Sequence, residues 1–182
     1  MSLAELIRLC PPPAVPWDNN APGREDELAA EYGVRFSPDY VGLCRAYGTG
    51  RFVSPNTHEI FLYNLFAPHF RAQVEDGRLS LDVFFSNPPA RVALADQSLD
   101  PTRLFPLGGD TDDALIAVPL DLPEGGGRVV VAFGERDVFE VVHGGPTDLL
   151  VGFFTGQLHV RGWEHRMVGG RPQAYQFLPP QR

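Results

Sequence analysis

Residues 104–142 read LFPLGGDTDDALIAVPLDLPEGGGRVVVAFGERDVFEVV. Short apolar runs stand in this stretch, and glycine, proline and acidic clusters separate them. Runs of this length between turn-forming residues are typical of strands that pair through hairpins. The stretch therefore predicts an antiparallel meander with strands at 104–107, 115–118, 128–133 and 138–142. The expected hairpin connections contain Gly125, Gly126 and Gly127, and Gly134 with Glu135.

Helices are expected before the meander. Apolar residues within 1–10 recur at the spacing of a short amphipathic helix. A second helix is expected over 24–32, with acids in its first turn and a stop at Gly33. A third is expected over 37–47, because Ser37 can cap a helix that begins at Pro38. Its buried residues and its left-handed stop are expected to be Tyr40, Leu43, Cys44, Tyr47 and Gly48.

The remaining segments complete the predicted architecture. Residues 51–54 and 59–66 read as paired strands. Residues 68–76 and part of 79–97 are helical candidates, although Pro88 and Pro89 interrupt the second stretch. A helix over 146–157 carries an apolar face and stops at Gly156.

These segments together predict an α+β fold. It consists of a mostly antiparallel sheet of about five to six strands, with N-terminal and C-terminal helices packed around it. We expect one domain over 1–160 and a C-terminal extension over 161–182. The extension is either mobile or a strand that wraps back onto the domain.

The charged residues exclude several kinds of chemistry. All fifteen cations are arginine, so no lysine is present to form a Schiff base or a phosphate-loop contact. The net charge of −8 argues against direct nucleic-acid binding and favours a basic partner, or simply solubility. No secretion signal or membrane-spanning apolar stretch is recognised, and the two cysteines lack metal or redox spacing. A cytoplasmic protein with reduced cysteines is therefore expected, with no membrane association.

Three groups of residues, in order along the chain, resemble landmarks of the SUKH superfamily. The first is the helix start Pro38-Asp39-Tyr40, followed by Gly48 and Gly50. The second is Leu104-Phe105-Pro106-Leu107-Gly108, where the family usually has tryptophan in place of Leu107. The third is the strand containing Phe139 and the helix that ends at Gly156. The resemblance covers roughly residues 28–158.

The resemblance implies a protein that binds a partner. Bacterial members of the superfamily act chiefly as immunity proteins that neutralise polymorphic toxins, and members are not generally enzymes. We therefore expect an immunity protein without cofactor that binds a basic toxin domain, such as a nuclease. The alternative is an intracellular scaffold or regulator of the same superfamily.

Catalytic and metal sites find little support in the sequence. The turn with Asp110, Asp112 and Asp113 lacks the glycine and the twelfth-position glutamate of a calcium loop. The histidines do not have zincin spacing, and the glycines do not stand between a strand and a helix as nucleotide loops require. A catalytic triad assembled from distant residues stays an open alternative. No metal site is predicted.

The candidate partner contacts are sought in turns and in the tail, because a scaffold presents such segments to solvent. They are Asp110, Asp112, Asp113, Glu135, Asp137 and Trp163. For Trp163 the alternative is a role in docking the tail onto the domain. Asp39 is interpreted as an acid that compensates the dipole of its own helix, with partner contact as the alternative.

Overall fold

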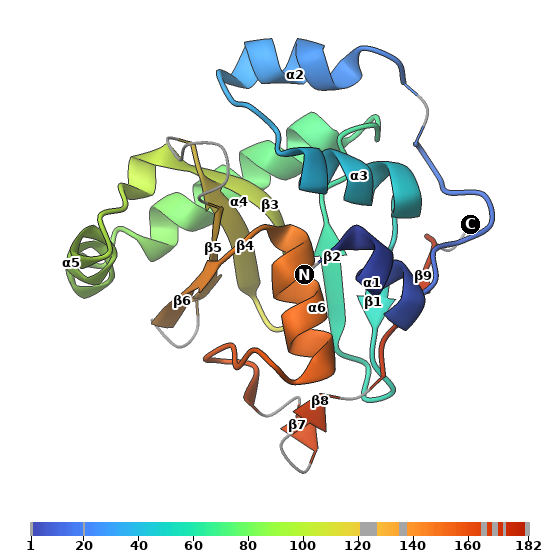
Figure 1. Ribbon diagram of the computed structural model, residues 1–182. Helices are drawn as coiled ribbons and strands as arrows, with labels where there is room; N and C mark the ends of the chain where they lie inside the picture. Colours follow the sequence, from blue (N-terminus) through green and yellow to red (C-terminus); the bar gives the residue numbers. More distant parts are fainter. Residues whose placement is uncertain are drawn as a thin grey trace.

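A seven-stranded antiparallel sheet forms the centre of the computed structural model (Figure 1). The model describes residues 2–19, 21–120, 127–134, 138–164, 167–168, 171–172 and 174–180. The strands are β1 (Arg51–Val53), β2 (Glu59–Leu62), β3 (Leu104–Asp110), β4 (Ala114–Pro119), β5 (Arg128–Phe133), β6 (Val138–His143) and β9 (Gln176–Leu178). Their spatial order is β6-β5-β4-β3-β2-β1-β9. The predicted meander and the strand pair before it are confirmed.

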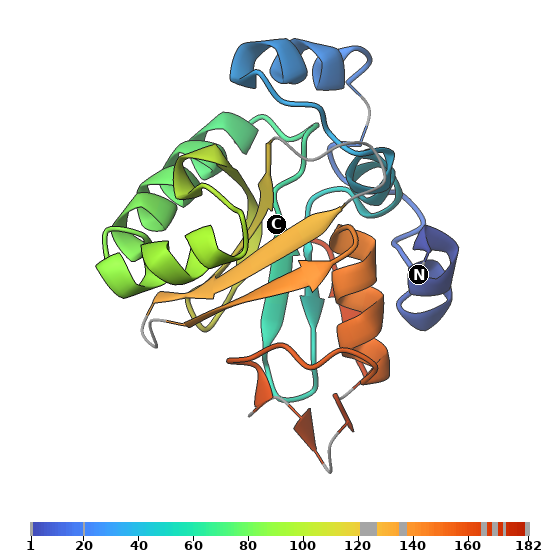
Figure 2. The same ribbon diagram turned by 60° about the vertical axis from the view of Figure 1, so that its left-hand side comes forward.

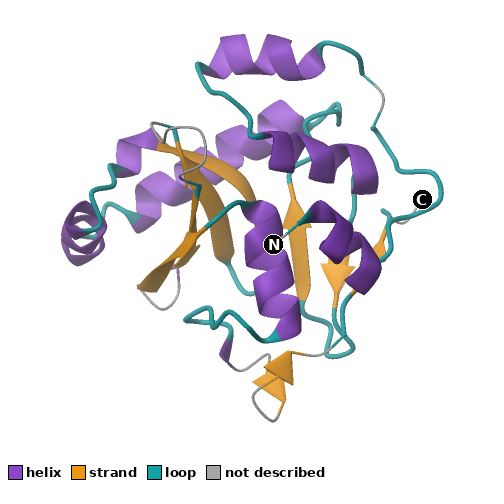
Figure 3. Cartoon of the chain, viewed as in Figure 1, coloured by secondary structure: helices purple, strands orange, loops and turns teal. Residues whose placement is uncertain are grey.

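Within the part of the chain that the structure describes, six α-helices surround the sheet, and Figure 3 shows their arrangement. They are α1 (Leu3–Leu9), α2 (Arg24–Tyr32), α3 (Pro38–Tyr47), α4 (Phe70–Phe84), α5 (Pro88–Asp96) and α6 (Pro146–Thr155). A short 3₁₀ turn, Pro101–Arg103, precedes β3, and β7 (Met167–Val168) pairs with β8 (Arg171–Pro172) in a separate hairpin. The predicted α+β fold is confirmed. Among the helices of the described ranges, none is both long and apolar enough to cross a bilayer.

The two faces of the sheet are covered by different helices (Figure 2). Val130 and Ala132 of β5 pack in a cluster with Leu81 of α4 and Leu94 of α5. Residues on the opposite face of β5 pack with α6, α3 and α1 in the larger cluster. Both faces of β5 are therefore buried, which explains why this strand reads as a continuous apolar run.

Helix α3 follows its sequence signals closely. The hydroxyl oxygen of Ser37 accepts a hydrogen bond of 3.2 Å from the backbone N–H of Tyr40. The four residues expected in its buried stripe are all buried. Gly48 ends the helix at φ +68°, and a Cβ there would lie 2.1 Å from the carbonyl oxygen of Trp17. Two features therefore favour glycine at position 48: its positive φ and the close approach of the Trp17 backbone.

The region between β2 and β3 is more regular than expected. Pro88 begins α5 and does not interrupt a helix, because the first position of a helix needs no N–H donor. Helix α4 continues through Gly77, where a Cβ would lie 2.7 Å from the ring of Pro106. This contact lets the helix lie directly against β3.

The tail returns to the sheet. Strand β9 pairs with β1, with Phe177 opposite Phe52, and adds one strand to the predicted number. Of the two alternatives for the tail, the wrapped strand is confirmed. Gly50 permits this pairing, since a Cβ there would lie 2.6 Å from the carbonyl oxygen of Leu178. Trp163, Tyr175 and Phe177 of the tail thus share the core of residues 1–160.

Candidate functional site

The turn between β3 and β4 is built around a buried carboxylate. Asp110 is 7% exposed, and its Oδ1 accepts hydrogen bonds of 2.8 Å from the backbone N–H groups of Asp112 and Ala114. Thr111 ties the same turn to β2, because its backbone N–H and side-chain oxygen both bond to the backbone of Glu59. The shape of the turn is thus fixed from inside.

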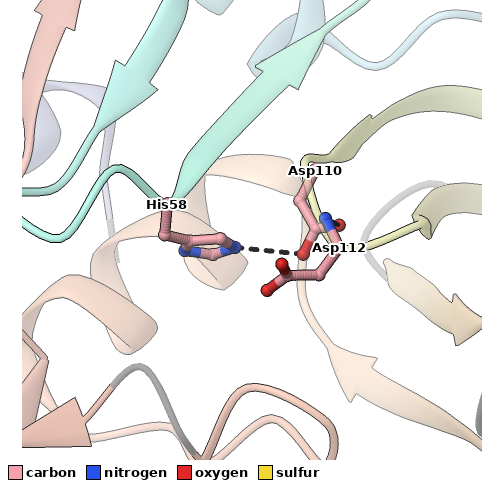
Figure 4. Close-up of side chains that lie close together, drawn as sticks. All are labelled: His58, Asp110 and Asp112. Carbon is pink, nitrogen blue, oxygen red and sulfur yellow. Dashed lines mark hydrogen bonds and ion pairs between the residues drawn. The ribbon is translucent and has the colours of Figure 1, made fainter.

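The second oxygen of Asp110 joins three distant parts of the chain. Oδ2 accepts a hydrogen bond of 2.6 Å from the indole N–H of Trp163 and lies 3.0 Å from Nε2 of His58 (Figure 4). The other ring nitrogen of His58, Nδ1, lies 2.5 Å from the hydroxyl of Tyr175. We call Asp110, His58, Trp163 and Tyr175 the buried network. It connects the turn, the loop before β2 and the tail.

One proton arrangement satisfies every polar atom of the buried network. With Asp110 as a carboxylate, Nε2–H of His58 donates to Oδ2, and Nδ1 accepts from the Tyr175 hydroxyl. Asp110 then accepts bonds from His58, Trp163 and two backbone N–H groups. Such charge-assisted bonds offset the cost of burying the carboxylate. The network therefore has the character of a structural element.

The same geometry argues against a catalytic triad at this histidine. His58 is fully buried, and its ring is enclosed by Phe153, Trp163 and Tyr175. The hydroxyl oxygen of Ser54 accepts a hydrogen bond from the backbone N–H of His58. Among the described residues that line the groove beside the turn, Asp110 is present and His58 is not, so this groove does not lead a substrate to the imidazole.

Three side chains in this region offer possible metal ligands. One ligand atom each of His58, Asp110 and Asp112 lies within 4.8 Å of the others (Figure 4). The direct contact between His58 and Asp110, together with the Trp163 N–H on the same oxygen, accounts for this proximity by hydrogen bonding. A cation at this point would have to replace the proton of Nε2.

Two of the expected partner contacts lie in the core. Asp110 and Trp163 were expected at exposed positions, and this expectation is wrong because both side chains are buried. The alternative role of Trp163 is confirmed: its ring packs 4.6 Å from that of Phe153 and fixes the tail on α6. Asp112 is half-buried and Asp113 is exposed. Glu135 and Asp137 lie outside the described residues.

A groove of about 830 Å³ opens beside Asp113. On one side it is lined by Leu79 and Val83 of α4, which are 65% and 73% exposed. Phe61 of β2 and Tyr63, which directly follows β2, line another part, and their rings stack 6.2 Å apart. We call this feature the α4 groove. Exposed apolar side chains that lie together at a groove, in contrast to single ones, are typical of an interaction surface.

The α4 groove carries an exposed carboxylate. Among its described lining residues this is Asp113, none is arginine or histidine, and the carboxylate of Asp110 is buried behind the lining. Burial raises the pKa of Tyr63, and the negative charge of Asp76 raises it further. Asp76 is exposed one turn of α4 before Ser80, another residue of the lining. The groove thus combines an apolar wall with the exposed carboxylate of Asp113, and Asp76 lies nearby on α4.

The residues that carry the family resemblance have structural roles. Asp39 accepts a hydrogen bond of 2.9 Å from the backbone N–H of Thr147, and the Thr147 hydroxyl donates to its other oxygen. The Asp39 carboxylate thus caps the N-terminus of α6. The sequence predicted that it compensates the dipole of α3, in whose first turn it lies. Tyr40 donates from its hydroxyl to the carbonyl of Tyr63. Gly108 approaches the backbone of β2, and Gly156 ends α6 in the left-handed conformation.

The exposed aliphatic pair and the buried network were missed by sequence reasoning. Leu79 and Val83 are four residues apart, a spacing that indicates one helix face, but it does not tell whether that face is inside or outside. Asp110 contacts His58, which lies 52 positions before it in the chain, and Trp163, which lies 53 positions after it. No local pattern reports such contacts.

Comparisons with protein-family models, with curated proteins and with solved structures found no match for this chain.

Proposed function

We propose that the chain is a non-enzymatic protein that binds a basic protein partner at the α4 groove. We further propose that it acts in the cytoplasm as an immunity protein and neutralises a toxin domain, such as a nuclease, by direct binding. The observation that carries the proposal is the exposed pair Leu79 and Val83 beside the exposed carboxylate of Asp113, in a groove whose described lining has no cation.

The groove has the composition of a protein-binding surface. The apolar side chains that line it would lose water on binding, which supplies the main attraction between proteins. The exposed carboxylate of Asp113 favours a partner with arginine or lysine and speeds the encounter. The net charge of −8 also attracts a basic partner at long range.

The buried network supports a role in binding over one in catalysis. Its histidine and aspartate are hydrogen-bonded to each other and to the tail, so they hold the binding turn in shape. The resemblance to the SUKH superfamily points the same way. It is also the basis for choosing an immunity protein over a general binding domain.

The proposal is tested by a growth-rescue assay. A candidate toxin domain from a neighbouring gene is expressed in cells with and without the protein, and the pair is then co-purified. Rescue by the native chain is expected, and Leu79→Gln combined with Val83→Gln should abolish it. Val92→Gln is the matched control, because Val92 is 62% exposed on α5 but does not line the groove.

The outcomes separate the two functions. Rescue together with a stable complex supports the immunity protein. Failure of the native chain to rescue or to form a complex would overturn that proposal. An unbiased pull-down would then test the scaffold alternative.

A further inference from the structure

Within the described residues, one edge of the sheet is long and pairs with no further strand. Strand β6 (Val138–His143) lies at the end of the strand order, beyond β5 (Figure 2). The opposite edge is β9, which has three residues and is followed by Pro179 and Pro180. Short strands and prolines prevent further pairing at an edge. β6 has six residues and contains neither proline nor lysine nor arginine, so its edge lacks these protections.

The register identifies which backbone groups of β6 point away from the sheet. The N–H of Gly144 donates to the carbonyl of Gly127, and the pairing continues with Val142 opposite Val129. In an antiparallel pair, every second residue directs both its N–H and its C=O toward the neighbouring strand. The outward groups are therefore those of Phe139, Val141 and His143. Within the described part of the chain, none of these groups has a hydrogen-bond partner.

We propose that the β6 edge pairs with the β6 edge of a second copy of this chain. The three outward-pointing residues are centred on Val141, so a two-fold axis at Val141 places each of them opposite an outward-pointing residue of the second copy. Val141 then faces its own counterpart, and Phe139 faces His143 of the second copy. Antiparallel pairing of this kind joins the two sheets into one.

The side chains are compatible with this register. Phe139 and Val141 are half-buried and pack against the cluster of α4 and α5, and the ring of Phe139 lies 6.1 Å from that of Phe85. A neighbouring strand would cover their exposed parts. Glu140, the only carboxylate of the strand, faces Val142 of the second copy. No like charges therefore stand directly opposite each other across the seam, where they would be destabilising.

Net charge gives this pairing a characteristic salt dependence. Two chains of charge −8 repel each other at long range, while the bonds along the seam are short-range. Added salt screens the repulsion and leaves the backbone bonds intact. The dimer should therefore become tighter as ionic strength rises. A complex with a basic protein would weaken under the same change.

The experiment is sedimentation velocity of the full chain from low micromolar to submillimolar concentration, at physiological and at high ionic strength. The native chain should dimerise, and more tightly in high salt. Val141→Pro should weaken the dimer about tenfold or more, since each copy loses the Val141 N–H that donates across the seam. The proline leaves the β5–β6 ladder bonded, because the Val141 N–H points outward. Val141→Thr, which keeps the N–H, should still dimerise.

A second readout does not depend on the fold of the proline variant. In the native chain, amide hydrogen exchange at Phe139, Val141 and His143 should slow as protein concentration rises. A monomer at all concentrations, with exchange at these amides independent of concentration, would overturn the proposal. A dimer unaffected by Val141→Pro would also overturn it. Neither readout involves the toxin domain, so failure here is distinct from failure of the proposed function.

Discussion

The indole N–H of Trp163 donates a hydrogen bond of 2.6 Å to Oδ2 of Asp110. This bond joins the segment after α6 to the turn between β3 and β4. Because Oδ1 of the same carboxylate holds the turn, docking of the tail and the shape of the candidate binding surface depend on one residue.

Trp163→Phe should lower the free energy of unfolding by about 2–3 kcal/mol. Phenylalanine keeps an aromatic ring against Phe153 but leaves the buried carboxylate without one donor. Urea unfolding measures the change. Trp17→Phe is the control, since Trp17 is 38% exposed, and its effect should be much smaller. Equal losses in the two variants would contradict the role given to the Trp163 bond.

Asp110→Asn should destabilise the protein by about 2 kcal/mol or more, because the amide NH₂ replaces an acceptor where only donors converge. Asp113→Asn makes the same chemical change three residues further along, at an exposed position of φ +60°. Asparagine tolerates this backbone conformation, so stability should change by less than about 0.5 kcal/mol. Thermal unfolding of both variants provides the comparison, and similar midpoints would contradict the account.

Much of the fold could be predicted because its signals are local. Ser37 and Pro38 mark the start of α3, and the valines of β5 mark a strand buried on both faces. Gly77 misleads local reading, since a glycine inside a helix usually weakens it. Here it allows α4 to approach Pro106, a contact that only the tertiary structure shows.

The candidate site could be predicted only in part. The acidic turn was found from its composition, but burial of Asp110 depends on His58 and Trp163, which reach it from distant segments. The same holds for Asp39, whose partner Thr147 lies 108 positions away. Local sequence identified the residues as polar, and the tertiary contacts decide which of them face solvent.

Asp39→Ala should cost about 1–2 kcal/mol of stability, because the N-terminus of α6 loses the carboxylate that accepts from Thr147. Thr147→Ala should cost a similar amount, and the double variant should lose less than the sum, since both changes remove the same interaction. Asp96→Ala, at an exposed position of α5, is the control and should be near neutral. Strict additivity in urea unfolding would show that the two residues do not interact.

The two cysteines should be unreactive in the folded protein. Burial raises the pKa of Cys10 to about 11 and that of Cys44 to about 12, from 9.0. At pH 8 the thiolate fraction of Cys10 falls by about two orders of magnitude relative to an unperturbed thiol. Labelling with a thiol reagent should therefore be at least about 100-fold slower for the folded chain than in denaturant. Equal rates would contradict burial of both thiols.

The same pKa shifts predict a loss of stability at high pH. A thiol whose folded pKa is raised stays protonated in the folded state while the unfolded chain ionises. The stabilisation is complete below pH 9.0, the unfolded value, and is lost as the pH rises toward about 11 and 12. The midpoint temperature of thermal unfolding should therefore be lower at pH 10.5 than at pH 8. Cys44→Ala should reduce the steepness of that fall.

The most direct test of the central claim is calorimetric titration of the chain with a purified candidate toxin domain from a neighbouring gene. The account predicts a one-to-one complex that weakens with salt. Charge reversal at Asp113→Arg should weaken it by about tenfold or more, whereas Asp96→Arg, the same reversal on exposed α5, should leave it nearly unchanged. The absence of binding by the native chain, or equal affinities of these two variants, would contradict the claim.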